Sequence, residues 1–360
     1  MEKYIELLRD AMKTKPKSLR AARQKSSSTP LDVYRMNYNE SPFGMPPKAA
    51  EVLYEACKRP YIYPDWFSIE LKTEIAKLYG LSIDNIVTGS GSSTLICMLG
   101  EIFLNPGDEV IFGDPSYEAF RDVINDYGAT QVPIPLTNDY LYDLDAMYDA
   151  ISPKTKMIII CNPNNPTGTF VDSAKVEAFI RKLPGNILIV IDEAYMEYVT
   201  RKDSYSMVKL IKEEIDQPLI VLRTFSKIYG MAGVRVGYAL TSPSLVDYFN
   251  KSSHAWNLST LGQSAAAAAI RDQDFIHEVR DFMEKARKEV TEQLRALGCK
   301  VWDSESNFLL FEAPIEPKVI AQALADEKIQ IGSPIGLNRV SLGTKEMNEK
   351  FIYVMEKLLK

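Results

Sequence analysis

The sequence is poor in the residues that usually hold metals or form disulfides. Its 360 residues include two histidines, His254 and His277, and four cysteines that lie far apart without a CxxC pair. Two histidines are too few for a histidine-rich metal site, and isolated cysteines indicate reduced, mostly buried side chains rather than a disulfide framework. We therefore expect no bound metal and a reducing, cytoplasmic environment.

Long apolar runs and an excess of basic charge are also lacking. No run approaches the roughly 20 apolar residues that cross a bilayer, and the first residues lack the positive and apolar regions of a signal peptide. The formal net charge is −6, which argues against nucleic acid as the main partner. The composition, 46% hydrophobic, is that of a soluble globular protein with enough core for two domains.

Two regions of the chain differ in their pattern. From about residue 46 to 245, helical patterns alternate with short apolar runs at 85–89, 109–112, 157–161, 187–191, 219–222 and 236–240. Unbroken apolar runs are typical of strands covered on both faces, so this region predicts an α/β fold, a mainly parallel sheet in an α/β/α large domain. Residues 1–45 and 246–360 are expected to form a smaller α+β domain.

The smaller domain has helices and short strands without regular alternation. A long amphipathic helix ends at Gly298, where a glycine commonly follows a helix. Short strands are expected at 307–311, 329–331 and 339–342, with helices at 318–326 and 345–359. At the start of the chain, an amphipathic helix over 1–12 precedes a basic stretch over 13–25, which we interpret as a solvated linker rather than an arm that binds phosphate.

Polar residues directly follow several of the predicted strands, and ligands of open parallel sheets bind beyond the carboxyl ends of the strands. The segment 224–237 follows the apolar run at 219–222 and contains hydroxyl groups, Lys227, glycines and Arg235. A lysine in this place can capture an aldehyde covalently, while hydroxyl and guanidinium groups bind a phosphate. The segment therefore suggests a pyridoxal 5′-phosphate site; taken alone, a solvated lysine is the alternative.

Two further strand ends supply groups that bind a phosphate and a ring nitrogen. Small residues at 89–94 lead into a helix, whose first N–H groups and positive dipole end bind phosphate. Asp192 ends a buried strand, where a carboxylate needs a cation or a donor such as a protonated pyridine nitrogen. Tyr195 follows three residues later and can reach the same ring. For Asp192 alone, the cap of a helix is the alternative interpretation.

Two loops add groups for the remainder of a flat ring. Asn165 lies in the loop 162–168, which two prolines and a glycine make rigid, and its amide can donate to a phenolate oxygen. Tyr117 follows another strand and can stack on a heterocycle, although packing for its own sake explains a tyrosine equally well. The joint occurrence of all these groups at one sheet edge favours the cofactor site.

Three motifs resemble those of a known family. They are Asn-Pro-Asn-Asn-Pro-Thr-Gly at 162–168, Asp-Glu-Ala-Tyr at 192–195, and the pattern Ser-Lys-x-x-Gly-x-x-Gly-x-Arg-x-Gly at 226–237. With them the chain resembles the class I/II aminotransferases of PLP fold type I, and among these the histidinol-phosphate aminotransferases. The likeness extends over nearly the whole chain, from the loop at 37–42 to the segment 338–344.

The resemblance implies a role for each matching residue. Lys227 would form the internal aldimine and later move a proton, Asp192 would keep the pyridine nitrogen protonated, and Asn165 and Tyr195 would hydrogen-bond the ring O3′. Further cofactor contacts would come from Gly91, Ser92, Ser93, Tyr117, Thr224, Ser226 and Arg235.

The resemblance also implies how the substrate and a second subunit take part. Arg339 would grip the substrate carboxylate with both arms of its guanidinium, with Asn39 and Asn165 lining the same pocket. Tyr63 would reach the cofactor phosphate of a partner subunit, which makes the enzyme a homodimer with shared active sites.

The sequence departs from the family pattern at two places. Ser93 and Thr94 replace acidic residues of the phosphate turn, where backbone donors can still serve. Gly332 stands where an arginine usually helps to bind the substrate phosphate, and the loss of such a contact costs about 1.5–3 kcal/mol. The substrate therefore stays open between histidinol phosphate and a non-phosphorylated aromatic or aliphatic amino acid.

The prediction is a PLP-dependent aminotransferase with Lys227 as its general acid and base. It would move an amino group from an amino acid donor, glutamate, to a 2-oxo acid or a histidinol-phosphate-like acceptor in a ping-pong reaction. A decarboxylase of amino-acid phosphates or a C–S lyase on the same scaffold is the second hypothesis. A binding protein without activity is the third, and the intact Lys227, Asp192, Asn165 and Arg235 argue against it.

Overall fold

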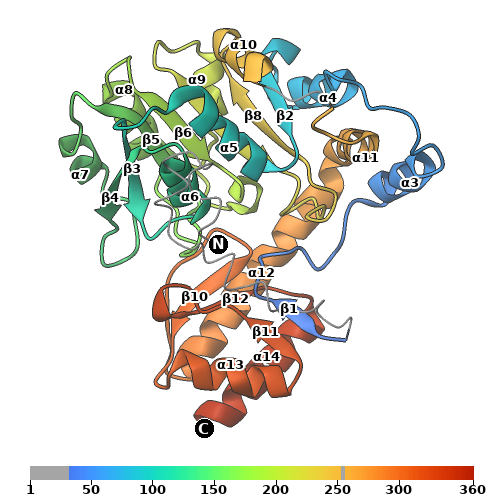
Figure 1. Ribbon diagram of the computed structural model, residues 1–360. Coiled ribbons are helices and arrows are strands. Elements are labelled where there is room, and N and C mark those ends of the chain that lie inside the picture. The colour runs from blue at the N-terminus through green and yellow to red at the C-terminus, as the bar shows by residue number, and fades with distance from the viewer. Residues whose placement is uncertain (1–31, 253–255) are drawn as a thin grey trace, which may run out of the picture.

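The computed structural model describes residues 32–252 and 256–360, and its ribbon is shown in Figure 1. The helix predicted over 1–12 and the basic stretch over 13–25 lie outside these ranges. The larger part of the molecule is built on a seven-stranded sheet and the smaller part on two short sheets (Figure 1).

The large sheet has the strand order β2-β8-β7-β6-β5-β3-β4. Only β8 runs antiparallel to its neighbours, so the prediction of a mainly parallel sheet is confirmed. The strands are β2 (Ile86–Gly89), β3 (Glu109–Asp114), β4 (Thr130–Pro135), β5 (Thr155–Cys161), β6 (Leu188–Asp192), β7 (Leu219–Thr224) and β8 (Gly237–Thr241).

Side chains of the central strands alternate between two hydrophobic cores, one on each face of the sheet. Ile158, Ile189 and Val221 belong to one core, whereas their neighbours Ile159 and Val190 belong to the other. The second core also contains residues of α5 (Ser92–Phe103), α6 (Ala119–Asp126) and α10 (Pro243–Ser252). The first contains residues of α4 (Ile69–Tyr79), α7 (Leu144–Asp149), α8 (Ser173–Lys182), α9 (Val208–Lys212), α11 (Thr260–Arg271) and α12 (Gln273–Ala296). Helices on both faces explain why these strands are apolar throughout.

The smaller part combines an antiparallel sheet, β12-β10-β9, with the parallel pair β1-β11. Its strands are β1 (Tyr34–Met36), β9 (Lys300–Val301), β10 (Phe308–Glu312), β11 (Ile329–Ile331) and β12 (Asn338–Ser341). The helices α13 (Pro317–Asp326) and α14 (Lys345–Leu359) lie against them, as predicted. The long helix α12 runs from the large part into the small part (Figure 1), and Gly298 follows it with a φ of +82°.

The segment after residue 245 packs partly on the large part. Val246 and Phe249 of α10 lie in the core that covers one face of the large sheet, and α11 packs against α4 and α3 (Pro47–Ala56). We propose that the two domains divide within α12 rather than at residue 246. Residues 32–45 are placed with the small domain in this proposal, because β1 pairs with β11.

A buried polar junction joins the two parts of the molecule. Arg287 of α12, whose side chain is 7% exposed, donates to the carbonyl oxygens of Tyr198 and Ser306 at 3.1 and 3.2 Å. The same guanidinium donates to Thr200 Oγ1 at 3.0 Å and pairs with Glu305 at 3.3 Å. Tyr198 belongs to the large part and Ser306 precedes β10, so one side chain holds both segments together.

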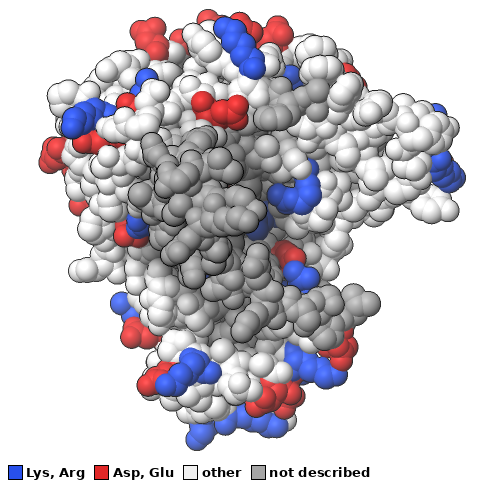
Figure 2. Space-filling model, viewed as in Figure 1, with Lys and Arg blue, Asp and Glu red and all other residues white. Residues whose placement is uncertain are grey.

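Two observations qualify the first expectations. Cys57, which directly follows α3, and Cys97 of α5 are exposed, whereas Cys161 and Cys299 are buried. The prediction of mostly buried cysteines therefore holds for half of them. None of the helices formed by residues 32–252 and 256–360 has both the length and the apolar character to cross a membrane. Acidic and basic side chains are interspersed over the described part of the face in Figure 2.

Candidate active site

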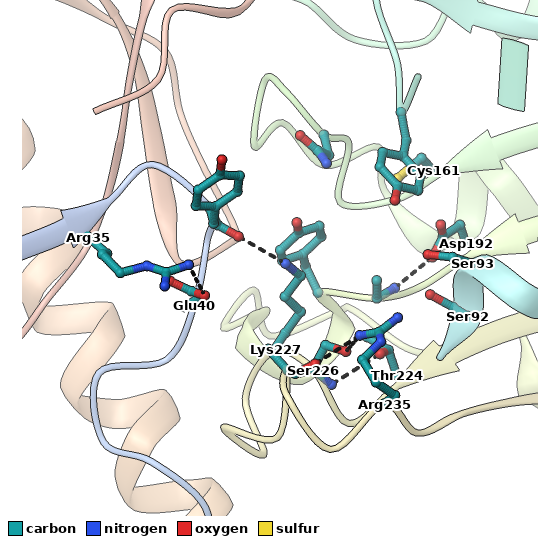
Figure 3. A pocket seen from close by; sticks show the side chains of 16 residues that line it. Arg35, Glu40, Ser92, Ser93, Cys161, Asp192, Thr224, Ser226, Lys227 and Arg235 are labelled. Carbon is teal, nitrogen blue, oxygen red and sulfur yellow. Dashed lines mark hydrogen bonds and ion pairs between the residues drawn. The ribbon is translucent and has the colours of Figure 1, made fainter. Parts of the chain in front are cut away.

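The loops that follow β2, β5, β6 and β7 meet at one edge of the large sheet and surround a cavity of about 300 Å³. Figure 3 shows this cavity with Lys227 at its centre. Of the cofactor-binding residues predicted from the sequence, those lining the cavity are Ser92, Ser93, Tyr117, Asn165, Asp192, Tyr195, Thr224, Ser226, Lys227 and Arg235. Residues far apart in the chain are thus brought together by the strand ends, as expected for an open parallel sheet.

Lys227 lies in the loop after β7, and its ammonium group points into the cavity. Its Nζ donates to the carbonyl oxygen of Tyr38 at 3.3 Å and lies 5.4 Å from the centre of the Tyr195 ring. Burial lowers the pKa of Lys227 to about 8, and the positive charge of Arg339 acts in the same direction. A lysine with this pKa is partly neutral near pH 8 and can therefore act as a nucleophile or a base.

Asp192 is the last residue of β6 and is only 2% exposed. Its Oδ1 accepts a hydrogen bond from the backbone N–H of Ala194 at 3.1 Å. Burial raises the pKa of this carboxyl group to about 6. A buried carboxylate is stabilised in its ionised form by a positively charged hydrogen-bond donor, and a protonated pyridine nitrogen is such a donor.

The donors predicted to form a phosphate cradle lie at the N-terminus of α5. Gly91 precedes the helix with a φ of +81°, and a Cβ at this position would lie 3.0 Å from Cζ of Arg235 and closer still to its Nη2. Arg235 donates to Ser226 Oγ at 3.4 Å and to the carbonyl oxygen of Ala232 at 2.9 Å. The hydroxyl of Thr224 accepts from the backbone N–H of Ser226 at 3.1 Å. Helix N–H groups, hydroxyls and a guanidinium converge here, and this donor set fits a phosphate.

The close approach of β8 to this turn also requires a glycine. A Cβ at Gly237 would lie 2.6 Å from the carbonyl carbon of Gly91. The last glycine of the segment 226–237 therefore allows the phosphate turn to rest directly on the sheet.

The polar groups predicted for the ring contact the substrate side as well. The amide oxygen of Asn165 accepts a hydrogen bond from Nη1 of Arg339 at 2.7 Å. The hydroxyl of Tyr195 accepts from Nδ2 of Asn39 at 3.0 Å, and burial raises the pKa of Tyr195 above its usual range. Asn39 is buried, and its hydrogen bond to Tyr195 links a residue predicted for the substrate to one predicted for the cofactor.

A second cavity, of about 620 Å³, adjoins the first. Tyr38, Tyr117 and Asn165 line both cavities, and Arg339 lines the second. Gly332 pairs with Arg339 through two backbone hydrogen bonds of 2.9 and 2.8 Å. A Cβ at Gly332 would lie 3.6 Å from Nη2 of Arg339, so a longer side chain at this position would reach the same space.

Tyr63 lies away from the Lys227 cavity of its own chain. Its side chain is 74% exposed and stacks on Trp256 with ring centres 4.7 Å apart. Its predicted contact with a partner subunit stays a prediction.

Sequence reasoning missed Arg35 and Glu40, which line the Lys227 cavity together with Tyr38. Arg35 precedes the loop at 37–42 and Glu40 lies within it; this loop has a place in the family pattern but carries no chemical signal of its own. An Arg–Glu pair five residues apart is common on protein surfaces, and only the packing of β1 on β11 brings this pair to the cavity.

A half-buried lysine just past a strand end, a buried carboxylate and phosphate-binding donors at a helix N-terminus are the features of an enzyme that uses pyridoxal 5′-phosphate. Residues 32–354 match the family model described as aminotransferase class I and II. The chain belongs to this family, is a PLP-dependent aminotransferase and has PLP fold type I.

Curated relatives and solved structures agree with the family. The chain is similar to the histidinol-phosphate aminotransferase of Moorella thermoacetica, with 34% identity over 91% of this chain and 86% of the relative. The enzyme of the same name from Brevibacillus brevis is also 34% identical, over 91% of each chain. The structure of histidinol-phosphate aminotransferase from Sinorhizobium meliloti in complex with pyridoxal-5′-phosphate matches with a TM-score of 0.87 and 27% identity over 98% of both chains.

Proposed function

We propose that this aminotransferase exchanges an amino group between glutamate and its 2-oxo acid on one side and histidinol phosphate and its oxo counterpart on the other. The observation that carries the proposal is the common name of relatives that match over about nine-tenths of this chain. The guanidinium of Arg339, held by Asn165 and by the carbonyl oxygen of Asn37 at 2.9 Å, supports it as the anchor of an anionic substrate group.

Each residue of the cavity has a part in this proposal. Pyridoxal 5′-phosphate, when bound, supplies an electron sink for the carbon that carries the amino group. Asp192 holds the protonated ring nitrogen, and Asn165 and Tyr195 hold the ring oxygen. Lys227 would hold the cofactor through Nζ until the amino group of the substrate replaces it. The freed amine would then move a proton between the amino-bearing carbon and C4′ of the cofactor.

Arg339 is proposed to orient the substrate, and Lys227 to transfer its proton. Arg339 offers two parallel N–H donors to a carboxylate or phosphate, which fixes its plane as well as its place. The lowered pKa of Lys227 leaves a useful fraction of its amine neutral at slightly alkaline pH. A group that is poised near the working pH transfers protons efficiently in both directions.

The reaction is proposed to be ping-pong, because the donor and the acceptor need the same arginine and the same lysine. The test incubates the enzyme loaded with cofactor with histidinol phosphate and 2-oxoglutarate and measures glutamate. We expect glutamate to form, and parallel lines in double-reciprocal plots when both substrates are varied. Intersecting lines would contradict the shared site, and transfer from an aromatic amino acid but not from histidinol phosphate would contradict the substrate. Release of CO₂ without amino transfer would refute the aminotransferase assignment.

We also propose that the enzyme acts as a homodimer through an aromatic surface that includes Tyr63. Large apolar side chains are exposed around it, at Tyr54, Tyr61, Ile62, Tyr63, Trp66, Phe67, Ile69 and Trp256. In Figure 2 the lobe around α3 shows mostly uncharged side chains. An exposed patch of this kind favours association with a protein surface. A second copy of the chain would bury it and bring Tyr63 to the partner's phosphate cradle.

Sedimentation of the wild type and of Trp66→Asp tests the dimer. We expect a dimer for the wild type and a monomer with weak cofactor affinity for the variant. A wild type that sediments as a monomer and still binds the cofactor tightly would refute shared sites.

A further inference from the structure

Four cations line the two adjoining cavities within the described ranges. They are Arg35, Lys227 and Arg235 in the first cavity and Arg339 in the second. Lys227 and Arg235 are committed to the cofactor, because one holds its aldehyde and the other belongs to the phosphate cradle. Two guanidinium groups, those of Arg339 and Arg35, are then left for a substrate.

The geometry points to Arg35 as a second anion-binding residue for the substrate, acting on the end of the molecule away from the reacting carbon. This inference rests on the proposed function, because glutamate and histidinol phosphate each carry more negative charge than a simple neutral amino acid. A glutamate bound by Arg339 through one carboxylate still presents the other. An unpaired carboxylate in a closing cavity is costly, so a second cation discriminates in favour of such substrates.

The position of Arg35 in the cavity supports this assignment. In Figure 3, Arg35 and Glu40 lie on one side of Lys227, whereas Asp192, Ser92, Ser93 and Arg235 lie on the other. We infer that a substrate approaches Lys227 from this side, because the other side holds the residues proposed to bind the cofactor.

Arg35 and Arg339 are held by the same short segment of chain. The guanidinium of Arg35 lies over the ring of Tyr38, 5.5 Å from its centre, and Nη2 of Arg339 donates to the carbonyl oxygen of Asn37 at 2.9 Å. Tyr38 lines both cavities. Arg35 and Arg339 therefore line neighbouring cavities that share Tyr38 as a wall.

The neighbourhood of Gly332 leaves the second anion site to Arg35. The strand β1 runs parallel to β11, with Arg35 opposite Gln330 and Met36 opposite Ile331, and Gly332 directly follows that strand. Position 332 has no side chain that could bind an anion beside Arg339. The neighbouring strand supplies the cation instead.

Glu40 competes with the substrate for Arg35. Its carboxylate pairs with Arg35 at 2.8 Å, and the two side chains remain 33% and 45% exposed. An exposed pair of this kind is weak, so an anionic ligand can share or replace the glutamate. Glu40 would thus orient Arg35 and limit its affinity at the same time.

Binding of two acids of equal chain length to the holoenzyme tests the inference. Glutarate has a carboxylate at each end and pentanoate at one end only, and calorimetry or competition against a substrate gives the dissociation constants. We expect the wild type to prefer glutarate by about tenfold or more, and Arg35→Gln to weaken glutarate about 10- to 100-fold while pentanoate changes less than twofold. Arg35→Lys should lie between them, since it keeps the charge but loses the fork.

Two further variants complete the experiment. Glu40→Gln removes the competing carboxylate and should bind glutarate more tightly than the wild type. Arg295→Gln removes a half-exposed arginine that pairs with Asp303 at 3.3 Å, and it serves as the matched control with unchanged binding.

Several results would overturn the inference. They are a wild type without preference for glutarate, an equal loss of both acids in Arg35→Gln, and no loss at all. Because binding of glutarate needs no amino transfer, an enzyme that fails to use glutamate but shows this pattern would refute the proposed function alone. An enzyme that uses glutamate but lacks the pattern would refute the role of Arg35 alone.

Discussion

Gly91 offers a sharp test of the phosphate cradle, because an alanine there would push on Arg235. A Cβ at position 91 would lie 3.0 Å from Cζ of Arg235. The clash itself is inexpensive, since a long side chain can move aside, but the guanidinium would then leave the cradle. The lost charge-assisted contact with the cofactor phosphate is worth about 1.5–3 kcal/mol. We therefore expect Gly91→Ala to weaken PLP binding about 10- to 100-fold.

Gly107 provides a matched control for this variant. It also has a positive φ, +91°, but a Cβ there would meet no atom within 4 Å. Gly91→Ala and Gly107→Ala should both lower the free energy of unfolding by about 1–2 kcal/mol, because both force an alanine into left-handed backbone. Only Gly91→Ala should change the dissociation constant, measured by titrating cofactor-free protein with PLP and following the absorbance. Equal cofactor affinity in the two variants would refute the role assigned to Arg235.

Three further predictions concern the carboxylate, the substrate anchor and the domain junction. Burial raises the pKa of Asp192 to about 6, so the stability that its protonated form contributes is complete below about pH 4 and is lost as the pH rises through 6. In urea unfolding of cofactor-free protein, the free energy of unfolding of Asp192→Asn should therefore rise relative to the wild type by up to about 3 kcal/mol between pH 4 and 7. A difference that stays constant with pH would contradict this. Arg339→Lys should lower kcat/KM for glutamate about 10- to 100-fold, because it keeps the charge but loses the two-pronged contact with Asn165 and the substrate; an unchanged value would exclude Arg339 as the anchor. Arg287→Met should lower the free energy of unfolding by about 1–3 kcal/mol, because it leaves the carbonyl oxygens of the buried Tyr198 and Ser306 without this donor, while Glu305 keeps its pair with Arg201 at 3.4 Å, whereas Arg280→Met on the exposed side of the same helix should cost less than about 0.5 kcal/mol.

The large sheet could be predicted from the sequence because strands buried on both faces consist of unbroken runs of apolar residues. Each residue of β5 from Met157 to Cys161 is buried, and such a run can be recognised as a strand without knowing which strands lie beside it. The edge strand β4 was missed because it contains Pro133 and Pro135 and is mostly half-exposed or exposed. A strand with prolines and no apolar run resembles a loop until its partner β3 is known.

The candidate site could be predicted from the sequence for a related reason. The residues proposed to bind the cofactor directly follow strand ends, so the order of the strands and the rule for parallel sheets place them together. The position of Arg35 could not be predicted in this way, since it depends on the pairing of β1 with a strand near the other end of the chain. Its chemical meaning appears only when Glu40, Tyr38 and Lys227 are seen around one cavity.

Reduction of the holoenzyme with borohydride tests the central claim most directly. Borohydride fixes the cofactor permanently on the amine that holds it, and peptide mass mapping then identifies that amine. We predict one pyridoxyl group per chain, on Lys227, and none in Lys227→Ala treated in the same way. A pyridoxyl group on another lysine, or none on the wild type, would contradict the account.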